Sequence, residues 1–165
     1  MVILGIDPGF RYAGYGVLKK DQGKTFLLEY GCLKLPQKES LSQRTGQFYT
    51  FFKEKINRWQ VTDIALETPF LGKNAQNFLK LGYLRGIIYL LADQHNTQLR
   101  EFTPSQVKQA LTGFGSAEKD QVARVIMRLF NISDPNIRND VTDALAITVC
   151  GLWQQETAKI LYKQV

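Results

Sequence analysis

The chain has few of the residues that build thiol or imidazole sites. It contains one histidine, His95, and two cysteines, Cys32 and Cys150, which lie far apart and in no CxxC or CxxH spacing. The sequence therefore predicts neither a zinc site nor a disulfide framework, and the histidine belongs to no evident catalytic triad. Two isolated cysteines fit a reducing compartment, so we expect a cytoplasmic protein.

Long apolar runs are also missing. The longest apolar stretch, residues 144–153, is too short to span a bilayer, and the N-terminal sequence MVILGID has neither a basic region nor a cleavage motif. We therefore expect no membrane insertion and no export.

Negative charge is scarce. The 165 residues include 21 Lys and Arg against 15 Asp and Glu, which gives a formal net charge of +6. A basic surface attracts polyanions, so the composition favours nucleic acid as a partner, with simple solubility as the alternative.

The chain length and the hydrophobic pattern predict one α/β domain. Apolar and β-branched runs predict strands at residues 2–7, 13–18, 25–35, 61–66 and 97–102. Helical periodicity predicts helices at residues 40–59, 74–96, 103–113, 116–130 and from 139 onward. The order βββαβαβααα predicts a five-stranded mixed sheet, in which three antiparallel strands are joined by two parallel ones.

Polar residues at the expected helix starts predict N-caps at Ser40, Thr103, Ser116 and Asn139. The helix over residues 74–96 is apolar on two sides, and its Gly82 and Gly86 allow a close approach. One apolar side is expected to pack in the core. The other apolar side needs another protein surface to cover it, which fits a twofold dimer.

Four carboxylates form the candidate site. Asp7 and Glu67 each end a predicted strand, and active groups gather beyond the carboxyl ends of parallel strands. Asp140 and Asp143 lie three residues apart, on one face of a helix start. Oxygen ligands without histidine suit Mg²⁺ or Mn²⁺, and two such ions promote phosphodiester hydrolysis. The alternative is that the two helix aspartates are caps and Asp7 is a turn residue.

Several other residues have both a functional and a structural interpretation. Lys108 and Lys119 flank a glycine turn and could bind phosphates, or they could be solvated. Phe70 follows Glu67 and could stack on bases or belong to the core.

Asp7-Pro8-Gly9, followed by Gly14-Tyr15-Gly16, could alternatively cradle a nucleotide phosphate through backbone donors, but the segment lacks the GxxxxGKS spacing.

Five segments together resemble the RuvC family of bacterial crossover-junction endonucleases over residues 1–152. They are GIDPG at 5–9, GYGV at 14–17, IALETPFLGKNAQNFLKLGYLRG at 64–86, VKQALTGFGSAEKDQV at 107–122 and DVTDALAI at 140–147. The resemblance implies an RNase H-like nuclease domain at residues 1–152, and it leaves a tail at 153–165 without a role.

The resemblance also implies the site residues. The family's metal-binding acids match Asp7, Glu67, Asp140 and Asp143, so Mg²⁺ is the expected cofactor, with two ions per site and Mn²⁺ as a substitute. The family's active-site lysines match Lys108 and Lys119, and its aromatic residue near the junction centre matches Phe70. We expect Phe70, Lys73, Lys108 and Lys119 to contact DNA.

Members of the family act as homodimers that nick two opposed strands of a four-way DNA junction and leave 5′-phosphate and 3′-hydroxyl ends. Branch-migration helicase proteins are their partners. Phe10, Tyr12, Ala13 and Pro69 depart from the family pattern, which leaves the preferred cleavage sequence open. A non-cleaving junction binder and a nuclease for structured RNA are the competing hypotheses.

Overall fold

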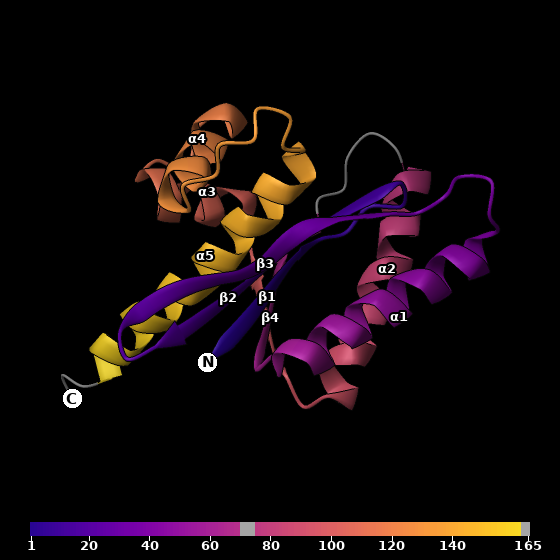
Figure 1. The fold of residues 1–165 in the computed structure, drawn as a ribbon, viewed down its shortest axis with the longest axis horizontal. Coiled ribbons are helices and arrows are strands. Elements are labelled where there is room, and N and C mark those ends of the chain that lie inside the picture. Colours follow the sequence, from indigo (N-terminus) through magenta and orange to yellow (C-terminus); the bar gives the residue numbers. More distant parts are fainter. Residues whose placement is uncertain (70–74, 163–165) are drawn as a thin grey trace.

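The computed structural model describes the backbone of residues 1–69 and 75–162, and side chains as far as residue 154 (Figure 1). The strands are β1 (Val2–Asp7), β2 (Tyr12–Asp21), β3 (Lys24–Lys34), β4 (Asp63–Glu67) and β5 (Gln98–Phe102). The helices are α1 (Leu41–Trp59), α2 (Ala75–Gln94), α3 (Pro104–Thr112), α4 (Lys119–Leu129) and α5 (Asn139–Tyr162). This order of elements agrees with the sequence prediction.

The strands form one sheet in the order β3-β2-β1-β4-β5. β1 pairs with β2 and β2 with β3 in antiparallel fashion, while β4 is parallel to both β1 and β5. β2 and β3 are joined by a tight turn at Gln22 and Gly23, where both residues have positive φ, as hairpin turns of this hand require. The predicted mixed sheet is therefore confirmed.

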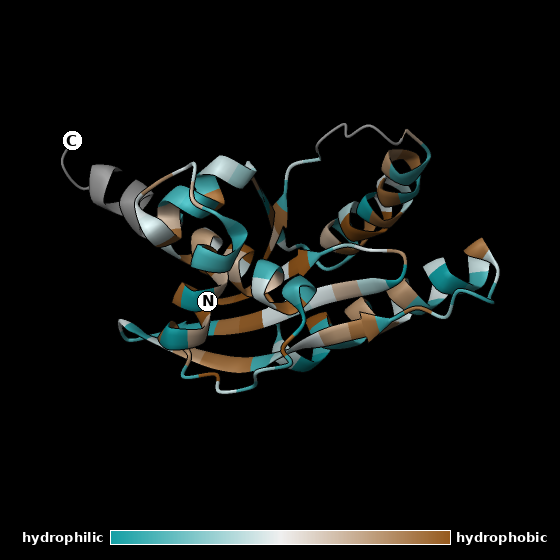
Figure 2. Cartoon of the chain, turned by 90° about the horizontal axis from the view of Figure 1, so that it is seen from above, coloured by the Kyte–Doolittle hydropathy of each residue, from teal (hydrophilic) through white to brown (hydrophobic). Residues whose placement is uncertain are grey.

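Helices cover both faces of the sheet. α1 and α2 lie on one face, and α3, α4 and α5 lie on the other (Figure 1). Successive side chains of a strand point to opposite faces, so Ile3 of β1 joins the core under α5, while Leu4 and Ile6 join the core under α1 and α2. Figure 2 shows hydrophobic residues along these strands.

Two of the predicted helix caps are confirmed and two are wrong. Ser40 and Thr103 each accept a hydrogen bond from the backbone three residues on, and both form a complete capping box. Ser116 does not cap α4, because residues 114–117 form a turn and Glu118 occupies the N-cap. Asn139 lies inside α5, since the carbonyl of Arg138 already accepts the first helical hydrogen bonds.

α5 continues beyond the matched region. The predicted domain boundary after residue 152 falls within this helix, whose backbone runs to Tyr162. Across residues 1–69 and 75–162, no helix combines the length and apolar character needed to cross a membrane.

Candidate active site

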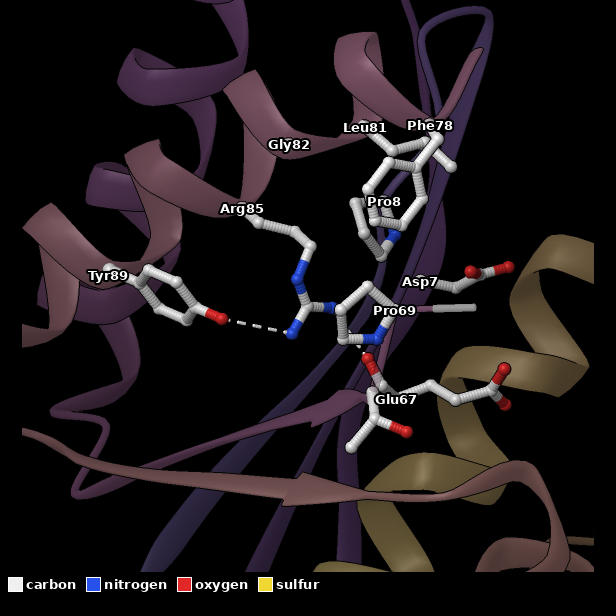
Figure 3. Close-up of a pocket in the computed structure, with 10 residues that line it drawn as sticks. Asp7, Pro8, Glu67, Pro69, Phe78, Leu81, Gly82, Arg85 and Tyr89 are labelled. Atoms are coloured by element: carbon white, nitrogen blue, oxygen red, sulfur yellow. Dashed lines mark hydrogen bonds between the residues drawn. The ribbon is translucent and has the colours of Figure 1, made fainter. Parts of the chain in front are cut away.

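Two carboxylates lie side by side where parallel strands end. Ile6 of β1 pairs with Leu66 of β4, so the following residues, Asp7 and Glu67, occupy the same edge of the sheet. Figure 3 shows both carboxylates pointing in the same direction, towards α5. The arrangement follows from the crossover connection, which brings the carboxyl ends of β1 and β4 together.

The other two carboxylates come from the first turn of α5. Glycines on the sheet allow this helix to lie directly on β1 and β2: a Cβ at Gly14 would be 1.8 Å from the carbonyl oxygen of Asp140, and one at Gly5 would be 2.1 Å from Thr148 Oγ1. Asp140 and Asp143 therefore start a helix beside the strand ends. Gly14 lies in a strand and serves helix packing, so it does not form the phosphate-cradling turn considered as an alternative.

The charges of the other three acids act on Asp7. The pKa of Asp7 is raised to about 7, first by burial and then by the charges of Asp143, Asp140 and Glu67. Burial also raises the pKa of Glu67, and the positive charge of Lys119 opposes this increase. Each carboxylate that ionises here makes the next ionisation harder, and a bound cation would remove that cost.

Basic side chains neutralise the two helix aspartates. Lys119 Nζ lies 3.1 Å from Asp143 Oδ2, and Arg138 Nη2 lies 2.8 Å from Asp140 Oδ2. With the side chains in these positions, the described residues contain no group of three or more Asp, Glu, His or Cys close enough together to hold an ion. Carboxylate oxygens are the donors that a hard divalent cation prefers. The metal site stays a prediction.

Both predicted lysines lie beside the acids. Lys108 of α3 and Lys119 of α4 line a cavity of about 250 Å³ together with Glu67 and Asp143. The side chain of Lys119 is 76% exposed. Phe70 and Lys73 lie outside the described residues.

Two arginines near the acids were not predicted. Arg85 of α2 is buried and lines a second cavity, of about 350 Å³, beside Asp7 and Glu67 (Figure 3). Arg138 lies 3.6 Å from the centre of the Tyr12 ring and pairs with Asp140. Nothing in the sequence distinguishes Arg85 from a solvent-exposed arginine on a helix. The position of Arg138, two residues before Asp140, could have indicated that it lies near the acids.

A family model for the crossover junction endodeoxyribonuclease RuvC matches residues 3–151. The chain belongs to the RuvC family. RuvC of Chlorobium phaeobacteroides is 42% identical over 152 residues, which cover 92% of this chain and 81% of that protein. RuvC of Moorella thermoacetica is 38% identical over 164 residues, which cover 97% of this chain and 98% of the relative. The resemblance seen in the sequence is thus confirmed.

Solved RuvC structures share this fold over nearly the whole chain. RuvC of Thermus thermophilus in complex with a Holliday junction substrate has a TM-score of 0.85 and 25% identity, and the match covers 95% of this chain and 96% of that one. A second Thermus thermophilus RuvC structure has the same TM-score and 28% identity, and the match covers 96% and 97% of the two chains. The fold expected from the RuvC resemblance is confirmed.

Proposed function

We propose that this protein is a metal-dependent endonuclease that resolves Holliday junctions by nicking two opposed DNA strands. The observation that carries the proposal is the meeting of Asp7 and Glu67 with the acidic start of α5, in a chain of the RuvC family. The relatives are named crossover junction endodeoxyribonucleases, and the Thermus thermophilus protein was solved with a Holliday junction.

Two segments would hold the cofactor. Asp7 and Glu67 offer carboxylates from the sheet, and Asp140 and Asp143 offer them from α5. One or two Mg²⁺ ions, or Mn²⁺ in their place, would supply the charge that activates water and stabilises the leaving 3′-oxygen. The expected products carry 5′-phosphate and 3′-hydroxyl ends.

The chain's own residues prepare this chemistry. Burial and the neighbouring carboxylates raise the pKa of Asp7 to about 7, so a cation held at this site would favour its ionised form. Lys108 and Lys119 line one cavity beside the acids, and both are proposed to contact the scissile phosphate. Phe70 and Lys73, which follow Glu67 in the sequence, are proposed to contact DNA next to the cut.

A homodimer supplies the second active site. α2 exposes large apolar side chains, with Leu79 57%, Tyr83 43% and Leu90 48% exposed. A Cβ at Gly82 or Gly86 would meet nothing within 4 Å, so another helix can approach there closely. We place the dimer contact on this α2 surface, defined by these five residues, and propose a branch-migration helicase as a further partner on the same junction.

The decisive experiment uses a labelled synthetic four-way junction with Mg²⁺ and maps the nicks. Wild-type protein is expected to cut two opposed strands at symmetric positions, and DNA ligase is expected to seal the products. Asp7→Asn is expected to bind the junction and to leave it uncut. An active Asp7→Asn protein contradicts the proposal. Uncut junctions with wild type indicate a binding protein, and preferential cutting of structured RNA indicates a different nuclease.

A further inference from the structure

Arg85 joins three elements next to the carboxylates. Only 6% of this residue is exposed, which is unusual for an arginine. Its Nη1 donates to the backbone carbonyl of Glu67 at 2.6 Å, and its Nη2 donates to the Tyr89 hydroxyl at 3.1 Å and pairs with the Glu101 carboxylate. One guanidinium thus connects α2 to β4 at Glu67 and to β5 at Glu101.

Arg85 donates to the Glu67 carbonyl at the point where β4 is no longer paired with β1. Pairing between β1 and β4 ends at Ile6 and Leu66, while β4 stays paired with β5 through Glu67 and Phe102. A buried carbonyl without a hydrogen-bond donor costs free energy. The planar guanidinium of Arg85 donates to the Glu67 carbonyl and at the same time pairs with the Glu101 carboxylate. Replacing a buried ion pair with two apolar residues often leaves a protein equally stable or makes it more stable. Stability alone therefore does not explain why Arg85 and Glu101 are paired here.

We propose that Arg85 is a positioning residue for Glu67: it fixes the strand end from which the Glu67 carboxylate reaches the metal site. The inference rests on the proposed function. Figure 3 shows the guanidinium at the Glu67 backbone, while the carboxylates of Glu67 and Asp7 point away from it towards α5. Arg85 therefore acts through the main chain, and neither the ion nor the scissile phosphate needs to touch it.

The test measures metal binding directly on the full-length protein without DNA. Arg85→Met is expected to weaken Mn²⁺ binding, followed by electron paramagnetic resonance, about tenfold or more, as the loss of outer-shell partners of metal ligands commonly does. Its affinity for a four-way junction in Ca²⁺ is expected to stay within about twofold of wild type, and excess Mg²⁺ is expected to restore most of the nicking rate. Arg85→Lys should recover part of the Mn²⁺ affinity, because an ammonium can donate to the carbonyl but lacks the fork.

Glu101→Gln is the matched control. It removes the ion pair on β5 and leaves the hydrogen bond to Glu67, so it is expected to lower the melting temperature without changing Mn²⁺ affinity. Mn²⁺ affinity at the wild-type level in the Arg85 variants, with a lower melting temperature alone, overturns the positioning role. If Arg85→Met does not fold, the Mn²⁺ affinity of Arg85→Lys alone tests the positioning role. A wild-type protein that neither binds Mn²⁺ nor nicks junctions refutes the proposed function instead.

Discussion

Asp7 is a carboxyl group that the folded chain holds where its charge is unfavourable. Its pKa is about 7, against an ordinary value of 3.8, because of burial and then of neighbouring carboxylates. A folded-state pKa above the unfolded one means that stability falls as the pH rises from 3.8 to about 7 and stays reduced above it. In EDTA at pH 8, Asp7→Asn is therefore expected to raise the melting temperature, by roughly 5 °C.

The pH dependence of this gain is the sharper part of the prediction. At pH 5 wild-type Asp7 is itself mostly protonated in the folded state, so the advantage of Asp7→Asn should shrink. Asp21→Asn, which changes an exposed aspartate paired with Lys19, serves as the control and should show no gain. Differential scanning calorimetry at both pH values decides, and an equal gain at pH 5 and pH 8 contradicts the electrostatic explanation.

We expect Arg138 to compete with a metal ion for Asp140. The guanidinium donates two hydrogen bonds to Asp140 Oδ2 and lies over the Tyr12 ring. Arg138→Ala is expected to lower the Mg²⁺ concentration for half-maximal nicking modestly, by roughly two- to fivefold, as the loss of an exposed ion pair allows. Arg11→Ala is the control, because Arg11 also lies near the Tyr12 ring, at 5.4 Å. An unchanged or higher Mg²⁺ requirement in Arg138→Ala contradicts competition.

At the scale of elements, the position of α5 on the sheet determines where its two acids lie. A Cβ at Gly14 would be 1.8 Å from the Asp140 carbonyl, so Gly14→Ala has to push the start of α5 away from β2. The variant is expected to lose Mn²⁺ affinity by tenfold or more and to melt earlier. Gly46→Ala is the control, since its added methyl group meets nothing within 4 Å and α1 should gain about 0.5 to 1 kcal/mol. Isothermal titration and thermal unfolding measure both effects.

The sequence predicted the elements well where local rules apply. Short apolar runs predicted the strands that carry Asp7 and Glu67, and the capping signals at Ser40 and Thr103 are confirmed. The caps at Ser116 and Asn139 failed because several polar residues compete near each helix start, and tertiary packing selects among them.

Long-range partners were not predictable from the sequence. Arg85 contacts Glu67, 18 residues before it, and Glu101, 16 residues after it, and both contacts depend on how α2 lies on the sheet. The contact of Lys119 with Asp143 likewise depends on α4 packing against α5. The types of the candidate site residues were readable from the chain, but their partners required the fold.

At the scale of the whole molecule, the two faces of the sheet carry different groups of candidate functional residues. The α5 face carries two of the acids and both lysines, and the α2 face carries Arg85 and the exposed apolar surface. The four acids and the exposed α2 side chains thus belong to different parts of one subunit. Under the proposed function, each subunit contributes one set of acids, and paired cutting requires the dimer.

This separation predicts that dimerisation and metal binding can be uncoupled. Leu90→Glu puts a charge on the α2 surface, where the residue is 48% exposed, and is expected to give a monomer by light scattering. Mn²⁺ affinity should not change, whereas paired nicking of a four-way junction should fall by tenfold or more. Leu129→Glu, with the same charge at an equally exposed position on α4, should remain dimeric and active. A dimeric Leu90→Glu protein, or a monomer that still cuts both strands in concert, would show that the subunits meet elsewhere or act alone.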